Sequence, residues 1–341
     1  MRPAPPRRRW RSIAQVIAVT AIVAGAGAAI YADRATFGAG VTALGHLRAR
    51  WVGYAIAAET VSMVAFAQLE KGLLRAGGMT GRALTLRTVL VTAYRANAIA
   101  VMVPVAGSGM ATAYAYREFR RRGVEPAHVA VALTVAGICS TVTFAVLAAV
   151  AALLTGNVVA AVLAGAAGLA GAAATGAALL SLRYSRARGW LEAVAVLVLR
   201  AARRAIRRPR SEPAELVAGT VARIRAVRLG YRAAWQALGW ALLNWVTDAA
   251  CLVCAIAAAR APVPWRDVLI VWTAGASAAS FCPLPAGLGV VDIVLITALA
   301  AAGLPATKAV AAVLVYRIIT FKILFTLAWM AHERLASRRS R

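Results

Sequence analysis

Hydrophobic residues form long uninterrupted stretches in this chain, and most charged residues fall between them. Residues 127–182 contain no Asp, Glu, Lys or Arg. A membrane-spanning helix needs about 20 apolar residues, so this stretch predicts two spans, at 127–154 and 158–182. Further apolar runs predict spans at 13–31, 51–69, 233–259 and 307–332, with a loop at 32–50. The pattern therefore predicts an all-α polytopic membrane protein with about six full spans.

Two other apolar segments are each interrupted by a group of prolines and glycines, which we call a knot. The first knot contains Pro104, Gly107 and Gly109, and the second contains Pro283, Pro285, Gly287 and Gly289. Pro lacks a backbone donor and Gly tolerates unusual backbone angles. Backbone groups freed at membrane depth persist only where protein or a water-filled cavity satisfies them. We therefore expect two re-entrant hairpins, one with limbs at 84–103 and 109–117 and one within 266–302.

The two knots recur at a fixed separation. Gly107 and Gly287, Gly109 and Gly289, and Gly123 and Gly303 are each 180 residues apart. Matched interrupted helices in two halves of a membrane protein indicate a transport site. We predict an inverted repeat that pairs residues near 84–154 with residues near 265–332.

Charge sets the expected topology. The chain has 39 Lys and Arg against 12 Asp and Glu, a formal net charge of +27. Because the arginines flank apolar spans and no nucleic-acid-binding motif accompanies them, we expect cytoplasmic loops rather than nucleic-acid binding. The basic segments 1–12, 183–230 and 333–341 are predicted to be cytoplasmic, around one transmembrane domain at 13–332. Segment 183–230 has the pattern of an amphipathic helix on the inner leaflet, and the alternative is a surface that binds a regulatory protein.

Charged residues inside spans are rare and usually functional. The candidates here are Glu59, Arg95, Asp248, Asp292, Arg317 and Lys322. In the span 233–259, one helical stripe holds Gln236, Trp240, Asn244, Asp248 and Cys251, and such a polar stripe should face the protein interior. We predict that one cavity is bordered by two glycines of the second knot and by four charged residues, namely Gly287, Gly289, Arg95, Asp248, Asp292 and Arg317.

The deep basic residues favour an anionic ligand for this cavity. Arg95, Arg317 and Lys322 have only three deep acids to neutralise them, and the limbs after each knot aim helix N-termini at the same place. A lipid phosphate would supply the missing negative charge. The alternative is a purely structural ion pair, in which Asp248 or Asp292 binds Arg317.

Enzymatic chemistry has little support in the sequence. The histidines, at 46, 128 and 332, are scattered, and no clustered metal ligands or nucleophile–base pairs appear. The cysteines at 139, 251, 254 and 282 all fall in apolar segments. We expect no catalytic residues, no metal and no cofactor.

The second knot and the helix after it resemble a known family. The motif runs from Pro285 to Asp292, continues at Ala302-Gly303-Leu304, and ends in the aliphatic helix that carries Tyr316 and Arg317. It resembles the membrane (flippase) region of lysylphosphatidylglycerol synthetases and the stand-alone bacterial proteins built from it. Ala286 replaces a glycine that is common in that family, and Lys322 stands where an aromatic residue is frequent. The resemblance covers roughly residues 13–332 and implies lipid flipping without lipid aminoacylation.

Three functional hypotheses follow. The leading one is a transporter that moves an anionic or polyprenyl-linked lipid between the leaflets of the bacterial inner membrane. The second is an integral membrane transferase that uses lipid substrates. The third is a non-transporting partner of a separately encoded enzyme of cell-envelope synthesis.

Overall fold

The computed structural model describes residues 34–76, 84–103, 107–156, 230–282, 287 and 289–321, with a few scattered positions between 159 and 170. All the regular elements in these residues are helices: α2 (Arg34–Thr42), the 3-10 helix η1 (Ala43–His46), α3 (Ala49–Ala76), α4 (Leu86–Met102), α5 (Gly107–Arg121), α6 (Pro126–Leu154), α10 (Tyr231–Ala258), α11 (Val268–Phe281) and α12 (Val290–Ala301). A final helix begins at residue 306 and is described to residue 321; we call it helix 306–321. The all-α prediction is confirmed for this part of the chain.

Three of these helices are long and apolar enough to cross a membrane, namely α3, α6 and α10. They have 28, 29 and 28 residues, and they contain most of the predicted spans 51–69, 127–154 and 233–259. Helix α3 runs past its predicted end through Lys71 and Arg75, whose long side chains can carry their charge to the membrane surface. The predicted span 13–31, most of the span 158–182, and the basic segments 1–12, 183–230 and 333–341 lie outside the described residues.

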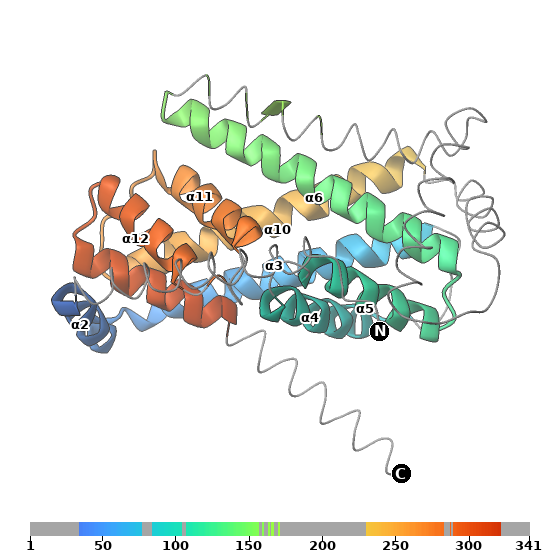
Figure 1. The fold of residues 1–341 in the computed structure, drawn as a ribbon, viewed down its shortest axis with the longest axis horizontal. Helices are drawn as coiled ribbons and strands as arrows, with labels where there is room; N and C mark the ends of the chain where they lie inside the picture. The colour runs from blue at the N-terminus through green and yellow to red at the C-terminus, as the bar shows by residue number, and fades with distance from the viewer. Residues whose placement is uncertain are drawn as a thin grey trace, which may run out of the picture.

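The interrupted segments form two pairs of shorter helices. Helices α4 and α5 pack together, as do α11 and α12, and they have 17, 15, 14 and 12 residues. Each is shorter than the roughly 20 residues that a span requires. In Figure 1, α4 and α5 lie toward one end of the long axis and α11 and α12 toward the other, and α3, α6 and α10 run between them.

The first pair is a hairpin whose two ends lie together. Arg122 Nη1, just after α5, donates a hydrogen bond of 3.3 Å to Thr88 Oγ1 at the start of α4. Arg122 also forms an ion pair of 2.8 Å with Glu118. The chain therefore leaves this hairpin beside the point where it entered.

Two predicted boundaries were wrong. The segment 32–50 was expected to be a loop, but it contains α2 and η1. Helix α2 packs against helix 306–321 because Gly40 lies directly on Val310, where an added methyl group would overlap the valine side chain. Small residues allow such close helix contacts in membranes. The limb predicted at 109–117 runs from Gly107 to Arg121, since Phe119 in its last turn is fully buried.

Among the labelled helices, α3 and α10 form the most extensive contact, and they are antiparallel. Arg48 N–H, just before α3, donates to the carbonyl of Ala258 at the end of α10 (3.0 Å). Farther along, Ser62 Oγ donates to the carbonyl of Asn244 (3.1 Å). Arg48 and Ser62 are 14 residues apart in the chain, and so are Asn244 and Ala258. The two helices therefore keep one register over this length.

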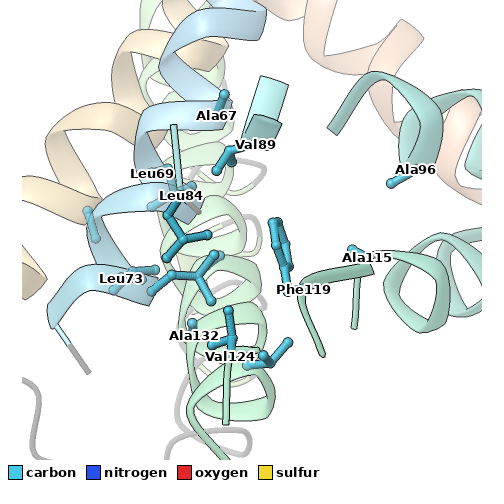
Figure 2. Close-up of a cluster of buried hydrophobic side chains, with 14 of the residues drawn as sticks. Ala67, Leu69, Leu73, Leu84, Val89, Ala96, Ala115, Phe119, Val124 and Ala132 are labelled. Atoms are coloured by element: carbon cyan, nitrogen blue, oxygen red, sulfur yellow. The ribbon is translucent and has the colours of Figure 1, made fainter. Parts of the chain in front are cut away.

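Each helix pair has its own buried cluster. The first cluster joins α4 and α5 to α3 and α6, and Figure 2 shows Phe119 among Leu73, Leu84 and Val124. The second joins α11 and α12 to α6, α10 and helix 306–321, around residues such as Trp272 and Leu299. Two cores separated along the molecule leave room for a site between them.

The turns that follow the two helix pairs are alike. Gly123 and Gly303 both have positive φ, 85° and 93°. In each turn the N–H of the residue after the glycine donates to the carbonyl of a fully buried residue. Val124 donates to Phe119 (3.2 Å), and Leu304 donates to Leu299 (3.1 Å). The two segments that share sequence features therefore also share their local backbone geometry.

Polar contacts around Arg260 hold three segments together at one end of the bundle. Arg260 Nε donates to the carbonyl of His46 (2.9 Å), and Lys308 Nζ donates to the carbonyl of Arg260 (2.8 Å). The Arg48–Ala258 hydrogen bond lies next to them. We call this set of contacts the Arg260 clamp, because it ties η1, the end of α10 and helix 306–321 to one another.

Candidate functional site

A cavity of about 780 Å³ lies where the two helix pairs approach each other. Its lining comes from α3, α4, α5, α6, α10, α11, α12 and helix 306–321. Gly107 and Ser108 reach it from the first knot, and Gly287 reaches it from the second. Both interrupted segments therefore end at the same space, between helices long enough to span a membrane.

The backbone of the second knot requires glycine. Gly287 and Gly289 have φ of 60° and 80°, a region that other residues rarely adopt. Gly289 precedes α12, and its N–H donates to Asp292 Oδ2 (2.9 Å). Gly287 lines the cavity and Gly289 is not among the lining residues. The knot prolines Pro104, Pro283 and Pro285 lie outside the described residues.

Arg317 forms an ion pair with Asp292. Arg317 Nε is 2.8 Å from Asp292 Oδ1, and the guanidinium lies over the ring of Phe321, 4.5 Å from its centre. Arg317 lines the cavity, whereas Asp292 is not among the lining residues. Asp292 also accepts a hydrogen bond from the Gly289 N–H. The carboxylate thus fixes both the knot and the guanidinium. The arrangement matches the structural pair that the sequence left open, with Asp292 rather than Asp248 as the partner.

Asp248 occupies a different part of the wall. Its Oδ2 accepts from Trp272 Nε1 at 3.0 Å and its Oδ1 accepts from Tyr316 Oη at 3.1 Å. These donors come from α11 and from helix 306–321, so Asp248 on α10 connects three elements of the cavity. Trp272 is 1% exposed, and it packs against Trp245 and Phe144. The sequence did not single out Trp272, because a buried tryptophan in an apolar segment gives no sign of its partner.

The expected excess of positive charge is not found in the described lining of the cavity. Three acidic residues line the cavity, Glu59, Glu70 and Asp248, and Arg317 is the one basic residue among the described lining residues. Arg95 is outside the lining and donates to Tyr114 Oη (3.5 Å), and Lys322 is outside the described residues. Sequence reasoning missed Glu70, because it adjoins Lys71 and resembles an interfacial residue. Its helical spacing from Glu59 (about three turns) would have placed both on one face.

The predicted polar stripe of α10 faces two environments. Asn244 and Asp248 line the cavity and Cys251 is fully buried, but Gln236 and Trp240 are exposed. Asn244 Nδ2 donates to Ser62 Oγ (2.8 Å) and to the Ser62 carbonyl (3.0 Å). These reciprocal bonds join α10 to α3 at the cavity wall. The proposed binding roles of Arg95, Asp248, Gly287, Gly289, Asp292 and Arg317 remain predictions.

The Ser62–Asn244 contact gives a first test of the site's architecture. We expect Asn244→Ala to lower the free energy of unfolding by about 1–3 kcal/mol, because the Ser62 hydroxyl and carbonyl both lose the hydrogen bond that Asn244 Nδ2 donates. Ser62→Ala should cost less, because the Ser62 carbonyl still accepts from Asn244. A double-mutant cycle, measured by thermal unfolding in detergent, should show coupling of at least about 0.5 kcal/mol. Additive effects of the two substitutions would contradict the contact.

The comparison with known families agrees with this architecture. The model of the family described as the lysylphosphatidylglycerol synthase TM region matches residues 13–328. The chain belongs to this family. No curated protein gives a significant match to it.

Membership accounts for the general character of the molecule. The family is a transmembrane one, and the match spans α2 to helix 306–321 and includes both knots. Together with the apolar helices, it makes the chain a multi-pass membrane protein related to proteins that handle lipids. The family resemblance stated from the second knot is confirmed.

Proposed function

We propose that this protein moves a phosphate-bearing lipid between the leaflets of the bacterial inner membrane. The observation that carries the proposal is the meeting of both interrupted helix pairs at one cavity. A lipid head group crossing the bilayer needs a polar path through apolar surroundings, because unsatisfied polar groups are costly there. In this proposal the cavity, whose lining includes Asn244, Asp248 and Arg317, forms such a path, and the lipid tails remain in the surrounding bilayer.

The groups that would hold a phosphate come from the knots and from Arg317. Helix α5 begins at Gly107 and α12 begins at Val290, and Gly107 and Val291 line the cavity. Helix N-termini carry partial positive charge and free N–H groups, which favour anions. Arg317 adds a guanidinium, whose planar fork suits phosphate oxygens.

The repeated turns support an alternating mechanism. Gly123 and Gly303 close the two helix pairs with the same hydrogen-bond pattern, and the cavity lies between the pairs. In our proposal the two units are inverted repeats, and rocking of one against the other opens the cavity to each leaflet in turn. Both chain termini are cytoplasmic in this scheme, in keeping with the arginine-rich flanks.

Filling the cavity should block transport without disturbing the fold. Gly137 on α6 lines the cavity, and an added Cβ there would meet no atom within 4 Å. Gly239 on α10 is equally open but outside the lining, so it provides a matched control. We expect Gly137→Trp to slow lipid movement by about tenfold or more, equal to about 1.4 kcal/mol of added barrier, and Gly239→Trp to leave it unchanged.

The measurement uses vesicles of phosphatidylethanolamine and phosphatidylglycerol containing purified protein and a trace of fluorescent phosphatidylglycerol. Loss of fluorescence to an impermeant quencher reports the lipid that reaches the outer leaflet. No acceleration by the wild-type protein over empty vesicles would contradict transport of this lipid. Equal rates for the two tryptophan variants would contradict the assignment of the cavity as the path.

A further inference from the structure

Glu59 is a buried acid that no hydrogen bond in the described structure stabilises. It lies near the middle of α3, is 5% exposed, and lines the cavity. Its Oε2 is fully buried and has no hydrogen-bond partner in the part of the chain that the structure describes. Buried polar atoms in proteins are nearly always paired, and an ionised carboxylate is especially unfavourable without a partner. An orphaned carboxyl that faces a cavity is therefore suited to bind something.

Among the residues that the structure describes, the groups that interact electrostatically with Glu59 do not supply a positive charge. Asp248 on α10 acts on it electrostatically, and Glu59 in turn acts on Tyr94 on α4, Cys251 on α10 and Tyr316 on helix 306–321. All four are neutral or acidic. Asp248 already accepts hydrogen bonds from Trp272 and Tyr316, and these donors stabilise its anionic form. Asp248 is thus supported as an anion by two hydrogen bonds, whereas Glu59 has no hydrogen-bond support among the described residues.

A proton fits this site better than a metal ion. Hard cations such as Ca²⁺ and Mg²⁺ take about six or more oxygen ligands, whereas a proton needs one lone pair. Among the described residues, no three His, Cys, Asp or Glu side chains converge to hold a metal ion. Adding a proton to the Glu59 carboxylate gives a neutral acid and removes the repulsion between it and Asp248.

We propose that Glu59 is a proton-binding site that couples lipid movement to proton movement. This inference rests on the lipid transport proposed above. A proton taken from water on one side neutralises Glu59 and lowers the negative charge that a phosphate meets on its way to Arg317. Lipid and proton then enter together, and Glu59 releases the proton to water on the other side. Glu70, farther along the same face of α3, is a second buried carboxyl that lines the cavity, and its Oε2 has no hydrogen-bond partner among the described residues.

The transport experiment compares vesicles with and without an imposed pH difference. For one proton per lipid, one pH unit corresponds to a bias of about tenfold, so we expect wild-type transport of fluorescent phosphatidylglycerol to accelerate severalfold in the direction of proton flow. Glu59→Gln should lose this response and Glu59→Asp should keep it. Glu125→Gln, at an exposed acid away from the cavity, is the matched control. Wild-type transport that ignores the pH difference would overturn the proton site and leave the proposed function standing.

A second measurement tests proton binding without transport. Trp272 donates to Asp248, which interacts electrostatically with Glu59, so tryptophan fluorescence of the purified protein should titrate with pH. We expect one transition of the wild-type curve to be absent in Glu59→Gln and present in Glu125→Gln. Identical titration of wild type and Glu59→Gln would overturn the inference, even if the protein moves no lipid at all.

Discussion

Replacing Arg317 with alanine is expected to reduce lipid transport about tenfold or more, because the lost hydrogen bonds between the guanidinium and a phosphate are worth about 1.5–3 kcal/mol. The substitution takes the guanidinium from the cavity wall and leaves Asp292, its partner at 2.8 Å, without that charge. Arg317→Lys keeps the charge but loses the planar fork. We expect intermediate expression and strongly reduced transport for the lysine variant in the vesicle assay.

A loss of transport in Arg317→Ala could come from the broken ion pair alone, so a double variant separates the two causes. In Arg317→Leu/Asp292→Asn both charges of the pair are gone, and the asparagine oxygen can still accept the Gly289 N–H. The pair is only partly buried, so removing both charges together should cost little stability. Normal thermal stability with transport still lost would support contact between Arg317 and the lipid. Recovery of transport in the double variant would show that the pair is only structural.

Gly107→Ala is expected to destabilise the first hairpin strongly. A Cβ at Gly107 would overlap the backbone carbonyl of Ala100, and a backbone atom cannot rotate away as a side chain can. Overpacking costs about 1–3 kcal/mol even where side chains can adjust, so we expect at least that loss, together with loss of transport. The readouts are thermal unfolding in detergent and the vesicle assay.

The matched control is two residues away. Gly109 lies in the same helix, and a Cβ there would meet nothing within 4 Å. Gly109→Ala should be neutral or stabilising by up to about 1 kcal/mol, since alanine is the better helix former. Similar losses of stability in both variants would show that the close approach of α4 and α5 at Gly107 is not what makes the first knot sensitive.

The long helices could be predicted from the sequence because hydrophobicity alone requires them. The runs that became α3, α6 and α10 are continuous, and basic residues mark several of their limits. The segment 32–50 could not be predicted in this way. Helix α2 depends on the contact of Gly40 with Val310, which lies far along the chain and leaves no local signal.

The candidate site was predictable only in part, for a similar reason. Charges inside apolar segments identified Glu59, Asp248, Asp292 and Arg317 before any geometry was known. Which acid pairs with Arg317 depends on how α12 packs beside helix 306–321, and periodicity does not specify that. The acidic lining was missed because Glu70 adjoins a basic flank in the sequence and yet turns inward in the fold.

The Arg260 clamp has a mechanical consequence. It joins η1, the end of α10 and helix 306–321 through hydrogen bonds to backbone carbonyls, so these three elements would move together. That end of the bundle is therefore suited to act as a fulcrum. In any rocking motion the displacement would grow with distance from it, so the α4–α5 hairpin, which lies toward the other end (Figure 1), would serve as the moving arm.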